Sequence, residues 1–203
     1  MHRKHLLEIL RRYEAVYPRE IATIERMRAF AVAHEDCFSR SCLPGHITAS
    51  CWIVSSDGNR ALLTHHAKLD RWLQLGGHAD GDSDPFAVAL REAREESGMA
   101  DFIEASGDEF PVPLDIDIHG IPARRKEPAH FHYDLRYFLI AGAEQSLQIS
   151  EESKDLRWVP RARITDLTDE ESVLRLERKT RERPAKNDPG TGLGEGASDG
   201  ERG

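Results

Sequence analysis

The stretch GGHADGDSDPFAVALREAREESG, from Gly76 to Gly98, determines how the rest of the chain is interpreted. Its second half predicts a helix with Asp84 as N-cap, Pro85 in the first turn and Gly98 at the end. At about 100° per residue, apolar residues form one stripe and three glutamates cluster roughly a third of a turn away. The stripe is Phe86, Ala89, Leu90 and Ala93, and the glutamates are Glu92, Glu95 and Glu96. The sequence therefore predicts a helix that packs on a sheet and carries carboxylates along one edge.

This segment resembles the Nudix box, G-x5-E-x7-R-E-U-x-E-E-x-G-U, in which U is an aliphatic residue. The matching positions are Gly77, Arg91, Glu92, Glu95, Glu96 and Gly98, with Ala93 and Met99 at the U positions. One position departs, because Ser83 stands where the pattern has its first glutamate. Asp82 and Asp84 flank Ser83 and are candidates to substitute for that glutamate in part. In the family the first glutamate contributes less than the R-E-x-x-E-E cluster, so the departure weakens the expected activity without removing it.

The resemblance implies a fold and a domain plan. The fold class is α/β (α+β), a Nudix-like α/β/α sandwich with a mixed central β-sheet, plus an N-terminal helical extension. The expected boundaries are 1–43 for the helical extension, 44–183 for the Nudix hydrolase domain and 184–203 for a disordered C-terminal tail. The tail is too poor in apolar groups to offset the entropy of ordering.

Periodicity predicts helices before the box and strands on both sides of it. Residues 3–37 read as two helices divided by Pro18, a hairpin that packs on the domain or, alternatively, serves as a dimerisation or substrate-lid element. The predicted strands are 47–54, 60–66, 102–105, 112–121 and 130–141, with a turn at 56–59 and a closing helix at 161–183.

The strand at 130–141 places His130, His132 and Asp134 on one face, because successive side chains alternate. If this strand pairs with 112–121, His119 joins them. Such a group has three readings: a transition-metal site, a contact to substrate phosphate, or histidines that are simply solvated or hydrogen-bonded. We take His130, His132 and Asp134 as the candidate substrate-binding residues.

The resemblance also implies the chemistry. It implies Mg²⁺, or Mn²⁺ as a substitute, held by Gly77, Glu92, Glu95 and Glu96, and hydrolysis of a diphosphate bond in a nucleoside diphosphate linked to another moiety, by metal-assisted attack of water. The catalytic candidates are Glu92, Glu95, Glu96 and Arg91, and helix spacing predicts that Arg91 orients a glutamate by pairing with Glu95. A further carboxylate is expected from Glu127, Glu151 or Glu152, as a ligand or as the base.

Ser83 keeps a second function open, a catalytically weak Nudix-fold nucleotide-binding or regulatory module. Isopentenyl diphosphate isomerases share the fold and use histidines around a metal, but the chain has no cysteine in the expected strand–loop setting, which disfavours that reading.

Charge and composition narrow the partners. The formal net charge of −8 argues against binding to extended nucleic acid and favours a small nucleotide-type diphosphate bridged by a cation. No apolar run approaches the roughly 20 residues of a membrane span, so no membrane partner is expected. Cys37, Cys42 and Cys51 lack a CxxC spacing and are predicted to be buried free thiols of a cytoplasmic protein. A homodimer is also considered.

Overall fold

An eight-stranded mixed sheet organises the chain in the computed structural model, which describes residues 2–108, 110–124, 127–143, 145–150 and 153–182. The elements in chain order are α1 (Arg3–Val16), η1 (Pro18–Glu20), α2 (Ile21–Ala33), β1 (Gly45–Val54), β2 (Arg60–His66), β3 (Arg71–Leu73), β4 (Leu75–His78), α3 (Pro85–Ser97), β5 (Phe102–Glu104), β6 (Asp115–Ile121), β7 (His130–Ala141), β8 (Ser153–Pro160), η2 (Arg161–Asp166) and α4 (Glu171–Glu182). The predicted tail at 184–203 lies outside the described residues, as do Glu151 and Glu152.

The two longest strands, β1 and β7, lie side by side and run parallel, with His46 opposite His132 and Ser50 opposite Arg136. The other strand pairs are antiparallel, so the expected mixed sheet is confirmed. β6 pairs with the first half of β7 and β5 with its end. The predicted hairpin of β1 and β2 is joined only near its turn, because β4 takes the place beside β1 from Thr48 to Cys51.

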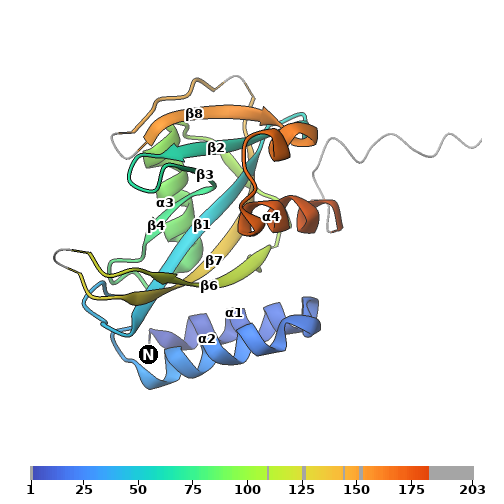
Figure 1. The fold of residues 1–203 in the computed structure, drawn as a ribbon. Coiled ribbons are helices and arrows are strands. Elements are labelled where there is room, and N and C mark those ends of the chain that lie inside the picture. The colour runs from blue at the N-terminus through green and yellow to red at the C-terminus, as the bar shows by residue number, and fades with distance from the viewer. Residues whose placement is uncertain (1, 109, 125–126, 144, 151–152, 183–203) are drawn as a thin grey trace, which may run out of the picture.

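The two faces of the sheet support different layers. Along β1, Ala49 and Cys51 belong to the core that contains the buried side of α3, whereas Trp52 and Val54 belong to the core beneath α4. Figure 1 shows α3 and α4 on opposite sides of the sheet. This is the predicted α/β/α sandwich, and strand alternation assigns alternate residues to each layer.

Local chemistry fixes both ends of α3, as predicted. The Asp84 carboxylate accepts hydrogen bonds from the backbone N–H groups of Phe86 and Ala87, at 3.0 and 3.2 Å. Gly98 ends the helix with φ of 72°, in the left-handed region that suits a residue without Cβ. Ala89 and Ala93 are fully buried. The capped ends and the buried alanines therefore fix the position of α3 on the sheet.

The helices α1 and α2 form a pair beneath the β6 side of the sheet (Figure 1). The ring of Phe30 stacks on Tyr133 of β7 with centroids 3.8 Å apart, and Lys179 of α4 donates to the Tyr13 hydroxyl at 2.6 Å. The pair thus contacts both the sheet and the last helix. No helix in the described ranges is both long and apolar enough to cross a lipid bilayer.

Two predicted helix boundaries are wrong. The second N-terminal helix ends at Ala33 rather than near residue 37. The segment 161–183 is not one helix, because the 3₁₀ helix η2 is followed by a separate α4. Thr168 lies between η2 and α4. Its hydroxyl donates to the Trp72 carbonyl at 3.3 Å and accepts from the Glu170 N–H at 3.2 Å. A hydroxyl used in this way stabilises a cap rather than a helix interior.

Candidate active site

Paired glycines let the glutamates of α3 approach strand β4 closely. A Cβ atom added at Gly77 would lie 2.6 Å from the carboxylate carbon of Glu92. The neighbouring Gly76 N–H donates to Glu96 Oε1 at 2.8 Å. Gly77 is therefore needed for space, and the backbone beside it fixes the position of Glu96.

Arg91 orients a glutamate, but not the predicted one. Its guanidinium donates to Glu92 Oε1 and to the His78 carbonyl, both at 2.9 Å. The expected pair with Glu95 is thus corrected to a pair with Glu92. The physical reason is that the β4 carbonyl draws the guanidinium toward the strand, where the adjacent Glu92 already packs on Gly77.

The donor set fits a hard divalent cation. Glu92, Glu95 and Glu96 stand at positions i, i+3 and i+4 of α3, which places their side chains side by side on the helix surface. The Glu92 side chain is 15% exposed, and Glu95 is exposed. Carboxylate and backbone oxygens are the ligands that Mg²⁺ prefers, with waters completing the octahedron. The space that a Cβ at Gly77 would fill is occupied by the Glu92 carboxylate alone, whose carbon and two oxygens lie 2.6–2.8 Å from that point.

The residues on either side of Ser83 form the N-terminal cap of α3. Asp84 caps α3, and Asp82 accepts a hydrogen bond from the Asp84 N–H at 3.0 Å. Asp84 precedes Glu92 by eight residues, about 12 Å along a helix axis. The structure thus uses both aspartates in local hydrogen bonds at the N-terminus of α3, two turns before Glu92.

A pocket of about 300 Å³ opens above the box. Its walls combine residues of the box with histidines, basic side chains and a short hairpin between β6 and β7. The lining residues are Arg40, Cys42, Leu43, His46, His66, Lys68, Leu69, Gly77, His78, Glu92, Ile121, Arg124, Glu127, Pro128, His130 and His132. Glu127, one of the predicted extra carboxylates, therefore lies at this pocket, where its backbone pairs with that of Arg124.

Five histidines gather at one end of the sheet. The ring of His46 lies 4.9 Å from those of His130 and His132, and the ring of His78 lies 5.0 Å from those of His46 and His132. His119 lies 5.3 Å from His132, because β6 pairs with β7 at these two positions. The predicted grouping of His119 with His130 and His132 is therefore present. His46 and His78 were not identified from the sequence, although His78 directly follows Gly77 in the box.

Burial keeps three of these imidazoles neutral, those of His46, His78 and His132. Burial, with the neighbouring histidines, lowers the pKa of His132 to about 2. Burial, Arg40 and His46 lower the pKa of His78 to about 4, and burial also lowers the pKa of His46. At neutral pH these rings therefore offer lone pairs rather than positive charge.

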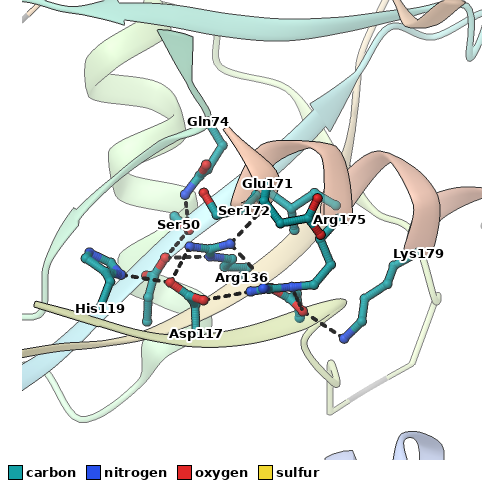
Figure 2. Close-up of polar contacts among 12 residues, drawn as sticks. Ser50, Gln74, Asp117, His119, Arg136, Glu171, Ser172, Arg175 and Lys179 are labelled. Carbon is teal, nitrogen blue, oxygen red and sulfur yellow. Dashed lines mark hydrogen bonds and ion pairs between the residues drawn. The ribbon is translucent and has the colours of Figure 1, made fainter. Parts of the chain in front are cut away.

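Asp134 belongs to a buried network rather than to the pocket. Its carboxylate accepts from the hydroxyls of Thr48 and Ser50 and from Arg136 Nε, at 2.9, 2.8 and 3.0 Å. Arg136, which is 2% exposed, also donates to Asp117 at 2.9 Å. Figure 2 shows this arginine at the centre of the network, with Arg175 of α4 beside it.

The same network reaches the histidines. Asp117 lies 2.9 Å from His119 Nδ1 and is also bound by Arg175 at 2.7 Å (Figure 2). Asp115, which is fully buried, is bound by Arg136, Arg175 and Lys179. These ion pairs join β6, β7 and α4. The sequence shows that Asp115, Asp117 and His119 alternate along a strand, but it does not show which basic side chains pair with the two aspartates.

Comparison with known proteins supplies a family model and structural relatives. The model described as NUDIX domain matches residues 44–180, which leaves α1 and α2 outside it. An Ap4A hydrolase from C. elegans, in a binary complex, is 18% identical with a TM-score of 0.53, over 67% of this chain and 95% of that chain. A NUDIX-family hydrolase from Clostridium perfringens is 24% identical with a TM-score of 0.52, over 67% and 94%. The Nudix hydrolase RenU from M. smegmatis is 19% identical with a TM-score of 0.50, over 68% and 85%. A comparison with curated proteins finds no match. At these identities, the structural likenesses establish the fold.

Proposed function

Because the chain belongs to the Nudix family, we propose that it hydrolyses a pyrophosphate bond in a nucleoside diphosphate linked to another moiety, with Mg²⁺ as its cofactor. Membership confirms the prediction from the motif that the chain is a Nudix enzyme. The observation that carries the finer proposal is the contact between Glu92 and Gly77, which leaves no room for a Cβ atom at that glycine.

The metal site is proposed to consist of Glu92, Glu95, Glu96 and the carbonyl of Gly77. A bound divalent ion neutralises phosphate charge and makes water more acidic. Arg91 holds the Glu92 carboxylate in place, and the Gly76 N–H holds that of Glu96. One of the glutamates accepts the proton of the attacking water, a role worth about 10²–10⁴-fold in rate.

The substrate is proposed to lie in the pocket with its phosphates between the box and the basic side chains. Arg40, Lys68 and Arg124 line the pocket. Lys68 and Arg124 offer positive charge to a phosphate chain, whereas the Arg40 guanidinium is paired with Asp80. His130 and His132 also line it, in keeping with their predicted substrate role. Asp134 is left out of the proposed contacts, since it is 3% exposed and its oxygens accept hydrogen bonds within the network.

A panel assay tests this proposal. The protein is incubated with nucleoside triphosphates, nucleotide sugars, ADP-ribose and dinucleoside polyphosphates, first with Mg²⁺ and then with a chelator. Turnover that disappears in chelator and in Glu95→Gln supports the enzyme. Tight nucleotide binding without product under any metal supports the alternative, a catalytically weak binding or regulatory module, which Ser83 favours because one carboxylate of the motif is missing.

Two further predictions remain proposals. A cytoplasmic location is supported by Cys37, Cys42 and Cys51, which are buried free thiols as expected in a reducing compartment. The homodimer also remains a prediction. Light scattering on the purified protein, which measures its mass in solution, tests it.

A further inference from the structure

We propose that His46, His130 and His132 form a binding site for a divalent transition-metal ion of the Zn²⁺ class, separate from the carboxylates of the Nudix box. The three side chains come from the first residues of β1 and β7, which the parallel pairing places next to each other. The site goes beyond the proposed hydrolysis and does not depend on it.

The distances suit such an ion after a small closure. One nitrogen from each of the three rings can be chosen so that all lie within 4.8 Å of one another. Zinc–nitrogen bonds of about 2.0–2.1 Å in a tetrahedral site place ligand nitrogens about 3.3–3.4 Å apart. The gap left to close is at most about 1.5 Å, and rotation of the imidazole rings can close it without a change in strand pairing.

Buried ring nitrogens without well-formed hydrogen bonds point to a missing ligand. His46 is 4% exposed, and neither of its ring nitrogens makes a hydrogen bond of normal geometry with the described residues. The Nε2 atom of His132 is likewise buried without such a bond. A buried polar atom left unsatisfied costs about 1–3 kcal/mol, so native structures seldom keep three together. A metal ion takes one nitrogen from each ring, so it satisfies one nitrogen of His46 and Nε2 of His132 and leaves the other nitrogen of His46 to the nearby backbone of Cys42.

A hydrogen bond to the backbone determines the tautomer of the third histidine. His130 Nδ1 lies 2.9 Å from the Pro128 carbonyl oxygen. Because a carbonyl only accepts, Nδ1 carries the proton in the neutral ring and Nε2 has a free lone pair. Metal-binding histidines commonly donate their other ring N–H to a carbonyl or carboxylate in this way, which fixes both tautomer and ring orientation.

The donor types separate this site from the box. Three imidazoles suit Zn²⁺ and related ions, whereas Mg²⁺ prefers the oxygens of the glutamates. His46, His130 and His132 line the same pocket as Gly77 and Glu92. A three-histidine site leaves one position open, here toward the pocket, for water or an oxygen of a ligand.

Titration of the full-length chain with Co²⁺ in excess Mg²⁺ tests the proposal, because four-coordinate Co²⁺ absorbs strongly in the visible range. We expect one bound Co²⁺, displaced by Zn²⁺, with affinity reduced at least about tenfold in His130→Ala and in His132→Ala. His65→Ala, which removes a histidine that stacks on Trp72 outside the cluster, serves as matched control and keeps the affinity. Glu95→Gln keeps it as well, which separates this site from the proposed catalytic metal.

X-ray absorption at the zinc edge provides a readout that needs no variant. The spectrum of the zinc-loaded wild-type protein is expected to show imidazole scattering from three histidines. A spectrum dominated by oxygen ligands, or Co²⁺ binding that survives both histidine variants and is lost in Glu95→Gln, overturns the proposal. The failure of Zn²⁺ or Co²⁺ to bind the wild-type protein overturns it too.

Discussion

Replacing Gly77 with alanine should lower activity strongly while sparing the fold. The new Cβ would lie 2.6 Å from the Glu92 carboxylate, whereas an ordinary contact begins at 3.4 Å, so the carboxylate must retreat by about 0.8 Å. A misplacement of about 1 Å at a catalytic group can cost 10²-fold in rate. We therefore expect kcat/KM to fall about 10²-fold, equivalent to about 2.7 kcal/mol of transition-state stabilisation. The clash involves only the end of a flexible side chain, so the melting temperature should change by less than about 4 °C, which corresponds to about 1 kcal/mol at this chain length.

Two other glycines supply the controls. At Gly120 an added Cβ would meet only a Phe131 ring carbon at 3.8 Å, so Gly120→Ala should keep both activity and stability. At Gly76 it would meet the Ser50 backbone at 2.5 Å, so Gly76→Ala should unfold the protein rather than selectively inactivate it. The assay is Mg²⁺-dependent turnover of the best substrate from the panel, with thermal unfolding of each variant. Full activity in Gly77→Ala would refute the reasoning, as would a loss of stability equal to that of Gly76→Ala.

Three more variants test the site and its support. In Glu96→Gln the amide oxygen can still accept a hydrogen bond from the Gly76 N–H, so the stability of the fold should persist. Loss of the negative charge should cost several kcal/mol of transition-state stabilisation, or roughly 10³-fold in Mg²⁺-dependent kcat. Unchanged turnover would contradict this. Arg136→Met takes from the buried Asp134 the cation that it pairs with and leaves it the hydroxyls of Thr48 and Ser50, so it should destabilise the fold by about 3–5 kcal/mol. Calorimetry should show this as a fall of about 6–20 °C in Tm, and a fall of under about 2 °C would speak against it. Burial acts to raise the pKa of Asp117, but His119, Arg136 and Arg175 outweigh it and hold the pKa well below its usual range. This stabilisation is present above the pKa of an unfolded aspartate, about 3.9, and is lost as pH falls toward the pKa in the folded protein. The free energy of unfolding, measured in urea from about pH 7 to 3, should therefore fall more in the wild type than in Asp117→Asn. Parallel curves for the two proteins would exclude the effect.

The local features were predictable from the sequence because short-range chemistry determines them. Asp84, Pro85 and Gly98 mark the ends of α3 through capping rules, and the family match confirms the resemblance that the box indicated. The alternation from His130 to Ala141 likewise predicted which residues of β7 share a face. Helix periodicity alone misjudged the C-terminal segment, because the interruption at Thr168 depends on a hydrogen bond to the distant Trp72 carbonyl.

The long-range features were not predictable. His46 meets His132 only because β1 and β7 run parallel, and the neighbouring contact from Thr48 to Asp134 spans 86 residues of sequence. The same pairing explains why Asp134 leaves the predicted substrate group, since the hydroxyls of β1 and the guanidinium of Arg136 occupy its oxygens. Strand order and register decide such contacts, and a single sequence does not encode them in any short pattern.

Anomalous diffraction from a crystal of the wild-type protein grown with Mn²⁺, a substitute for Mg²⁺, tests the central claim most directly. The account predicts a manganese peak within bonding distance of side-chain oxygens of Glu92, Glu95 and Glu96, next to the Gly77 carbonyl. A peak elsewhere, or the absence of any peak at these carboxylates at saturating Mn²⁺, would contradict it.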